Sequence, residues 1–454
     1  MLHTLSNLRP SRCVHSFYKL VSRRSSSSSQ KMTGHEWEDQ ARIFLQELKA
    51  TDPKELVKSM GGHRKPPEEN LFASYDEGFG YITSVAVGRS VEGFKFVRKT
   101  AYRLTSDTSK KPREFYTLKL LTSQASVNNA TGRAIEFDVY RKIGTVNPSS
   151  PGFNHCLHLE QSFTIFSPNG VHSCFVTEAL SSSLARLREP GKNRFSLPIV
   201  KRITKQVLHA LDYLHRECGY IHTGIKESDN ILASIPEPKH SRIENYVLSH
   251  SYRVYGPPLK LKSEEMPIIF TCSQPLPYFD LGGSLEEISV RLMDFSHATP
   301  VDNPDRSYYC QPGILRAPEV TLQYPWTSTI DIWTVGCLVF ELLTERYLFN
   351  QDDTGDNDYS HELHLQHIEE CLGPFPLEFL KDCKDWGKYF DEKGMLLHKD
   401  SNCEPTPIED VLRALEVMDE DKIPNTANFI RKCLTLDPKL RPSAQELLRD
   451  DWLS

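Results

Sequence analysis

The 454-residue sequence has few of the features that mark metal sites, disulfide frameworks, membrane spans or nucleic-acid contacts. Its 11 cysteines include no Cys-x-x-Cys pair and no close Cys/His cluster, which argues against zinc and disulfides and indicates a reducing compartment. The longest apolar run, near residues 332–340, is far shorter than the roughly 20 residues that span a bilayer, and predicts a buried helix. A net charge of −6 gives no support for binding nucleic-acid phosphates.

Acidic residues are missing from residues 1–35, where arginines accompany many serines. This composition is typical of a mitochondrial transit peptide. A disordered tail, or an extension ahead of a start at Met32, fits the same composition, so both interpretations stay open. Residues 36–70 combine helical periodicity with paired glycines and prolines, and predict a helical arm followed by a linker.

The segment 220–232 reads Y-I-H-T-G-I-K-E-S-D-N-I-L and resembles the catalytic loop of protein kinases. The resemblance implies that Lys226 neutralises the transferring phosphate and that Asn230 binds a metal ion. Gly224 stands where the family carries the Asp that accepts the substrate hydroxyl proton. Asn230 lies six residues after Gly224 rather than the family's five, so Asp229 becomes a candidate to replace the missing base.

Further segments resemble the nucleotide-binding parts of kinases, and imply ATP and Mg²⁺ as cofactors. They are a glycine hairpin, a strand lysine with a helix glutamate, a hinge between lobes, and a D-F-S triplet in the place of D-F-G. The resemblance assigns nucleotide contacts to Gly78, Gly80, Thr83, Val85, Lys119, Glu136, Glu178 and Leu180. It makes Asp294 the ligand of Mg²⁺, together with Asn230.

Several features together resemble the SR-protein kinases, especially fungal ones, over about residues 71–454. They include the H-T start of the catalytic loop, a long insert at about 234–290, and the run L-R-A-P-E-V. The resemblance implies an α+β, bilobal protein-kinase fold, with a small β-rich N-lobe at 71–180 and a larger helical C-lobe at 181–454. A buried Glu319–Arg441 pair would brace the C-lobe, and Asp331 would accept hydrogen bonds from the catalytic-loop backbone.

The family resemblance implies a serine/threonine protein kinase that acts on Arg-Ser-rich, splicing-type proteins. We expect a monomer that binds neither nucleic acid nor membrane, in the cytoplasm and nucleus, although the first 35 residues indicate mitochondria. Asp352, Asp353, Asp356 and Asp358 would either hold substrate arginines or form a solvated loop. The basic insert 95–113 has no assigned role.

Gly224 keeps alternatives to an active kinase open. A pseudokinase, which binds ATP or a partner without turnover, fits the loss of the base, and glycine also loosens the loop backbone. An error in the gene model at Gly224 is a further alternative. A small-molecule phosphotransferase is disfavoured, because the A-P-E and D-I-W motifs and Arg441 are features of protein kinases.

Overall fold

The computed structural model describes residues 90–91, 94–97, 100–103, 114–121, 123–167, 170–187, 194–226, 230–249, 276–277, 285–303, 308–349, 360–398 and 405–454. The chain divides into two compact units, each assembled from separate segments. The first unit comprises residues 1–135, 158–180 and 235–276, and the second comprises 136–157, 181–234 and 277–454.

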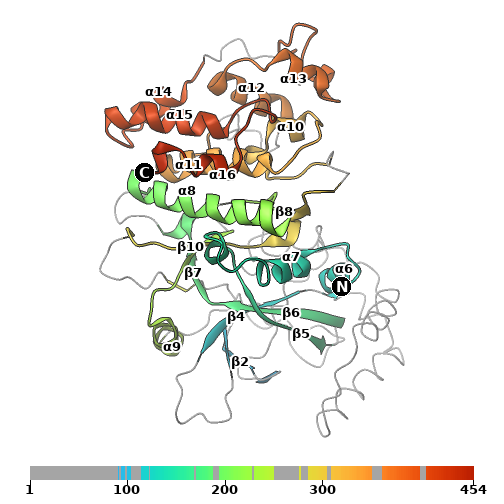
Figure 1. The fold of residues 1–454 in the computed structure, drawn as a ribbon, viewed down its shortest axis with the longest axis vertical. Helices are drawn as coiled ribbons and strands as arrows, with labels where there is room; N and C mark the ends of the chain where they lie inside the picture. Colours follow the sequence, from blue (N-terminus) through green and yellow to red (C-terminus); the bar gives the residue numbers. More distant parts are fainter. Residues whose placement is uncertain are drawn as a thin grey trace, which may run out of the picture. The chain divides into compact units, whose positions relative to one another are not determined.

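The first unit is built on a six-stranded antiparallel sheet in the order β1-β2-β3-β4-β6-β5 (Figure 1). Its strands are β1 (Ser90–Val91), β2 (Phe94–Val97), β3 (Thr100–Arg103), β4 (Phe115–Leu120), β5 (Leu159–Ser167) and β6 (Gly170–Glu178). In β4, Phe115, Leu118 and Leu120 are buried, whereas Lys119 between them is partly exposed. The strand therefore buries side chains on both of its faces and leaves its lysine accessible.

Two helices pack on this sheet. The helix α6 (Ser123–Ala130) turns small side chains towards β6, and the Ser126 hydroxyl accepts a 2.8 Å hydrogen bond from the Ser173 backbone N–H. The helix α9 (Lys239–Ser249) lies in the insert predicted at about 234–290. The backbone N–H of Phe115 in β4 donates to Nδ1 of His240 in α9 at 2.9 Å. This helix of the insert therefore contributes to the first unit, whereas residues 277–290 belong to the second.

The second unit is mainly helical. Its helices are α7 (Glu136–Ile143), α8 (Leu197–Asp212), α10 (Pro318–Thr321), α11 (Thr329–Thr344), α12 (His361–Leu372), α13 (Leu377–Asp382), α14 (Ile408–Ala414), α15 (Ile423–Cys433) and α16 (Ala444–Leu447). Its short strands are β7 (Leu180–Ser183), β8 (Tyr220–Ile221), β9 (Ile231–Ser234), β10 (Val290–Leu292) and β11 (Thr299–Pro300). They form a β10-β9-β7 sheet and a β11-β8 pair, so the catalytic loop runs between β8 and β9, two short strands as predicted.

The helix α11 is the centre of the second unit and contains the apolar run expected to be a buried helix. Every residue from Ile330 to Leu343 is buried, which confirms that prediction. The helix packs on α8 and α15 (Figure 1). A side chain at Gly336 would bring a Cβ to 2.8 Å from the Leu434 side chain, so the close approach of α15 requires glycine there.

The predicted ion pair beneath this core is present. Arg441 Nη1 and Nη2 donate to the two carboxylate oxygens of Glu319 at 2.6 and 3.0 Å, and neither side chain is exposed. Arg441 also donates to the backbone carbonyls of Thr435 and Thr329, both at 3.0 Å. These further bonds satisfy the guanidinium, as a buried charge requires.

The predicted division into a tail, an arm and two lobes remains a prediction. Residues 1–70 lie outside the described residues, and the two compact units are interleaved along the chain rather than divided near residue 180. Within the described part, no helix is long and apolar enough to cross a membrane.

Candidate active site

The catalytic-loop segment is fixed to the second unit by Asp331, in the first turn of α11. Its two carboxylate oxygens accept hydrogen bonds from the backbone N–H groups of His222 (2.8 Å) and Thr223 (2.9 Å), as predicted. Asp331 Oδ2 also lies 2.8 Å from Nε2 of His215, just beyond the end of α8. Three partners thus hold one buried carboxylate, and the backbone entering the loop is fixed through it.

His222 is a structural residue of this loop. The ring is completely buried, with Nε2 at 3.0 Å from the backbone carbonyl of Met293 and Nδ1 at 3.2 Å from the backbone N–H of Gly224. Since the carbonyl can only accept, Nε2 carries the proton and Nδ1 accepts from Gly224. Burial lowers the pKa of His222, and Asp331 partly opposes this shift, so the ring stays neutral. Both of its nitrogens are engaged in hydrogen bonds with backbone groups.

Thr223 connects the loop to the segment after Asp294. Its backbone has a positive φ of 64°, and its hydroxyl donates to the backbone carbonyl of His297 at 2.8 Å. Two residues after His297, Thr299 of β11 pairs with Ile221 of β8. Thr223 occupies the position where many kinases have an arginine, so here a direct hydrogen bond links the loop to the following segment.

Gly224 leaves room for a side chain. A Cβ placed there would have Nδ1 of His222 at 3.9 Å and Nδ2 of Asn230 at 4.0 Å as its nearest neighbours among the described residues. Both distances are ordinary van der Waals contacts, and the backbone of Gly224 does not have the positive φ that favours glycine. What the loop lacks at this position is therefore the side chain alone.

Asn230 returns to Gly224 despite the additional residue in the loop. Its Nδ2 donates to the backbone carbonyl of Gly224 at 2.5 Å, and its side chain is nearly buried. Its backbone N–H donates to the Lys226 carbonyl at 3.1 Å, and its carbonyl accepts from the Met293 N–H at 2.9 Å. One N–H of the amide is used by the loop, and the amide oxygen is the atom that can bind a metal ion.

Lys226 and Asp229 differ in how far the structure describes them. Lys226 is exposed, as a residue that meets a transferring phosphate must be. Asp229 lies in 227–229, outside the described residues, and its role as a substitute base remains a prediction.

Asp294 precedes a short turn of 3₁₀ helix, Phe295–His297. Its backbone is left-handed, with φ 63° and ψ 71°, a conformation that aspartate tolerates better than most residues do. Phe295 is completely buried and packs edge-on against Tyr140 of α7, with 5.3 Å between the ring centroids. Burial of the phenylalanine directs the neighbouring, partly exposed Asp294 away from the core.

The donor set suits a divalent ion of the magnesium type. The described residues contain no group of three or more His, Cys, Asp or Glu able to hold a metal by themselves. Magnesium in phosphoryl-transfer sites takes one or two carboxylates, with phosphate oxygens completing the shell. The Asp294 carboxylate and the Asn230 amide oxygen fit that pattern, and when bound the ion would neutralise phosphate charge.

The predicted nucleotide-binding residues are distributed over both units. Lys119 in β4 and Glu178 in β6 belong to paired strands of the first unit, and Leu180 is buried at the start of β7. Glu136 is completely buried at the start of α7 in the second unit. The Lys119–Glu136 pair remains a prediction. The hairpin residues Gly78, Gly80, Thr83 and Val85 lie outside the described residues.

Sequence reasoning missed two polar residues that support the loop and its surroundings. The contact of His215 with Asp331 was not anticipated, although its place near the end of the α8 pattern was known. The amide of Gln206 in α8 brackets β10, with Oε1 accepting from the Val290 N–H and Nε2 donating to the Ile288 carbonyl, both at 2.8 Å. The sequence could have indicated this role of Gln206, because a glutamine on the apolar face of an amphipathic helix must find hydrogen-bond partners when it is buried.

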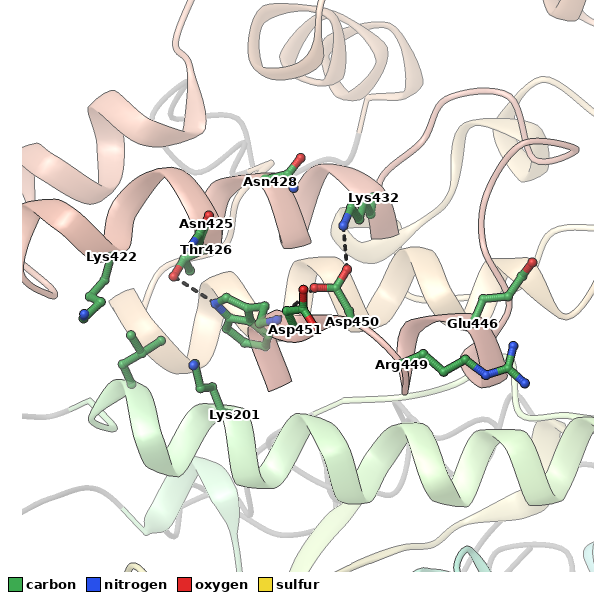
Figure 2. A pocket seen from close by; sticks show the side chains of 12 residues that line it. Lys201, Lys422, Asn425, Thr426, Asn428, Lys432, Glu446, Arg449, Asp450 and Asp451 are labelled. Carbon is green, nitrogen blue, oxygen red and sulfur yellow. Dashed lines mark hydrogen bonds and ion pairs between the residues drawn. The ribbon is translucent and has the colours of Figure 1, made fainter. Parts of the chain in front are cut away.

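A hollow of about 500 Å³ lies elsewhere in the second unit, and none of its 12 lining residues was predicted as a site residue. Two pairs of its lining residues bind each other (Figure 2). Trp452 Nε1 donates to the Thr426 hydroxyl at 3.0 Å, and Lys432 pairs with Asp450 at 2.6 Å. The Trp452 ring stacks on Phe429 of α15 at 4.1 Å. These contacts fasten the last described residues to α15, so the hollow is a structural junction.

Comparison with known proteins decides the family. A model described as the protein kinase domain matches residues 283–453. A serine/threonine protein kinase of Aspergillus fumigatus is 31% identical over 75% of this chain and 78% of the relative. The chain belongs to the protein kinase family. The serine/threonine-protein kinase SRPK of Physarum polycephalum is 27% identical over 85% of this kinase and 93% of the relative.

A solved kinase domain is similar in fold, with a TM-score of 0.52 at 21% identity, over 83% of this kinase and 95% of that chain. The predicted family and the predicted α+β kinase fold are therefore confirmed. Family membership implies a nucleoside triphosphate and a divalent metal ion as cofactors, and proteins as substrates.

Proposed function

We propose that this kinase transfers the γ-phosphate of ATP to serine residues of proteins, with Mg²⁺ as its metal ion. The observation that carries the proposal is the hydrogen bond from Asn230 to the Gly224 carbonyl, together with the hold of Asp331 on the loop. These contacts hold Lys226 and Asn230 just before β9. Asp294 follows β10, the strand that pairs with β9. The described residues before and after 227–229 are thus held in the way expected of a site that positions phosphates.

Each predicted site residue would have a distinct role in the transfer. Lys226 would neutralise charge on the transferring phosphate, and Asp294 and Asn230 would supply oxygen ligands to the metal. Lys119 and Glu136 would hold the α- and β-phosphates, and backbone groups of Glu178 and Leu180 would meet the adenine. Most of the rate enhancement in phosphoryl transfer comes from positioning and charge neutralisation, which these residues provide.

The missing base at Gly224 predicts a slow kinase rather than an inert one. General-base catalysis contributes about 10²–10⁴-fold, so an otherwise ordered site would retain measurable transfer without it. His222 cannot compensate, because both of its ring nitrogens bind backbone groups and its pKa is lowered by burial. The pseudokinase is the second candidate, favoured by the same glycine.

We further propose Arg-Ser-rich, splicing-type proteins as substrates, on the basis of the SR-protein kinase motifs and the relative named SRPK. The four aspartates between 352 and 358 that could dock arginines lie outside the described residues. We propose a monomer located in the cytoplasm and nucleus. Imaging of the full chain and of a variant lacking residues 1–35, each fused to a fluorescent protein, would test whether that segment directs the kinase to mitochondria.

Phosphate transfer from labelled ATP to an Arg-Ser repeat peptide tests the activity. The parent protein, Gly224→Asp and Lys119→Met would be compared. Transfer by the parent that is lost in Lys119→Met supports the proposal. If the parent is silent and Gly224→Asp is active, the chain is a pseudokinase that retains an intact site. If all three are silent and none binds ATP, the proposed function is wrong.

A further inference from the structure

The position left open by Gly224 is bordered by nitrogen atoms. Among the described residues, Nδ1 of His222 and Nδ2 of Asn230 are the nearest atoms to the place where a Cβ would lie, at 3.9 and 4.0 Å. Gly224 itself is partly exposed, so the position can be reached from solvent. A group brought by another molecule could therefore occupy the space that a side chain would fill.

Two described groups near this position can bind a carboxylate, whereas Nδ1 of His222 accepts a hydrogen bond and cannot do so. Lys226 is exposed two residues further along the loop. Asn230 uses one N–H of its amide for the Gly224 carbonyl, which leaves the second N–H as a hydrogen-bond donor. Asp331, whose carboxylate holds the loop, is buried and already accepts from His215, His222 and Thr223. The described part of the loop thus offers a cation and a hydrogen-bond donor, and the carboxylate that holds it, Asp331, is already occupied.

We propose that the acceptor protein supplies the missing carboxylate. The preferred substrate is then an Arg-Ser-rich segment in which Asp or Glu lies next to the phosphorylated serine. That carboxylate would occupy the open space at Gly224, near Asn230 and Lys226. This inference rests on the proposed kinase activity and names the substrate class for the same site.

The chemical step balances without any further reactant. The serine hydroxyl transfers its proton to the neighbouring carboxylate of the substrate, and its oxygen forms a bond to the γ-phosphorus. The bond between that phosphorus and the oxygen bridging to the β-phosphate breaks, which releases ADP. The substrate carboxyl group then gives its proton to water. Since the base belongs to the bound peptide, it is held close to the hydroxyl and acts at a high effective concentration.

The test compares two Arg-Ser peptides that differ only in Glu or Gln next to the serine. We expect the parent protein to show a value of kcat/KM at least about tenfold higher for the Glu peptide, within the range of general-base effects. Gly224→Asp should lose or reverse this preference, because its own carboxylate would repel that of the peptide. Gly224→Asn is the matched control that fills the space without supplying a base, and it should also lose the preference.

Two further measurements separate this inference from a general preference for acidic peptides. Peptide binding in the absence of ATP should be tighter for Glu than for Gln in the parent, and this difference should disappear in Gly224→Asp. Sodium formate should raise transfer to the Gln peptide by the parent, whereas sodium chloride at equal ionic strength should not. Asp229→Asn should keep the Glu preference, since the base comes from the peptide.

The inference is overturned if the parent treats both peptides alike, if Gly224→Asp keeps the same preference, or if Asp229→Asn abolishes it. A parent that is silent on both peptides, with and without formate, also overturns it. In that last case the activity of Gly224→Asp decides separately whether the proposed kinase function stands. Failure of the substrate inference and failure of the kinase proposal therefore give different results.

Discussion

The side-chain amide of Asn230 donates to the backbone carbonyl of Gly224, with 2.5 Å between the two atoms. The bond closes a loop that contains one residue more than the family pattern between these positions. It reaches the backbone of residue 224, so it does not depend on which side chain that residue carries. The geometry of the loop and the identity of its base are therefore separate properties.

This separation predicts that Gly224→Asp gains activity. The new side chain meets only ordinary contacts with His222 and Asn230, and it supplies the proton acceptor. Transfer from labelled ATP to an unmodified serine peptide should rise by about 10²–10⁴-fold. Gly224→Asn has the same size and cannot act as a base, so an equal rise in that variant would contradict the explanation.

Asn230→Asp should disturb the loop while it keeps an oxygen for the metal. The substitution replaces the donor that faces the Gly224 carbonyl with a carboxylate oxygen, which can only accept. We expect a loss of about 1–3 kcal/mol in the free energy of unfolding, since the Gly224 carbonyl loses its donor and the buried side chain at residue 230 presents a carboxylate oxygen to it instead. Urea unfolding measures this loss. An unchanged midpoint in Asn230→Asp would show that the bond does not order the loop.

Arg441→Met should be among the most destabilising substitutions in the second unit. It leaves the fully buried Glu319 carboxylate without its two charged hydrogen bonds, at a cost of about 3–5 kcal/mol. Lys439→Met is the control, because Lys439 forms an exposed pair with Asp382 and should change the melting temperature little. Similar melting temperatures for the two variants would contradict the role given to the buried pair.

Thr223→Val should lower kcat and leave ATP binding unchanged. It removes the hydroxyl that donates to the His297 carbonyl while it preserves the shape of the side chain. The link between the catalytic loop and the segment after Asp294 would weaken by about 0.5–1.5 kcal/mol, the net value of a typical hydrogen bond. Thr223→Ser retains the hydroxyl and should stay close to the parent. Equal loss in both variants would point to packing rather than to the hydrogen bond.

The stability of the protein should fall as the pH falls from about 6.5 to about 4. Burial lowers the pKa of His364 and of His172 from 6.5 to about 4, with backbone hydrogen bonds opposing the shift. Within this window the unfolded chain binds protons that the folded chain does not, so protonation favours unfolding by about 1.4 kcal/mol per pH unit for each histidine. Above this window the stabilisation is fully present.

Urea unfolding as a function of pH measures this effect. His364→Gln should unfold with a smaller pH dependence than the parent, because it removes one such proton-binding site. His398→Gln, at an exposed position, is the control and should follow the parent. A His364→Gln protein with the same slope as the parent would exclude His364 as a source of the acid sensitivity.

The sequence predicted those contacts that depend on spacing shared with the family. The Glu319–Arg441 pair and the hold of Asp331 on the loop both follow from such spacing. The glutamate expected on a helix, Glu136, is the first residue of α7, because the chain before it passes through a turn in which Gly132 has a positive φ of 72°.

Contacts that depend on the path of the chain could not be predicted. The extra residue before Asn230 made its position uncertain, and only the folded loop brings its amide to the Gly224 carbonyl. The approach of His215 to Asp331 joins residues more than a hundred positions apart. The packing of α9 against β4 likewise depends on where an insert of unusual composition returns to the sheet.

A loop whose backbone is fixed independently of its base also has a consequence for heredity. Some glycine codons differ from aspartate codons by a single base, so a point mutation could convert Gly224 to Asp or the reverse. Because neither change would have to be accompanied by a rearrangement of the loop, a lineage could pass between the two forms without an unfolded intermediate. Loss of the aspartate at this position would then be a reversible step in the descent of the gene.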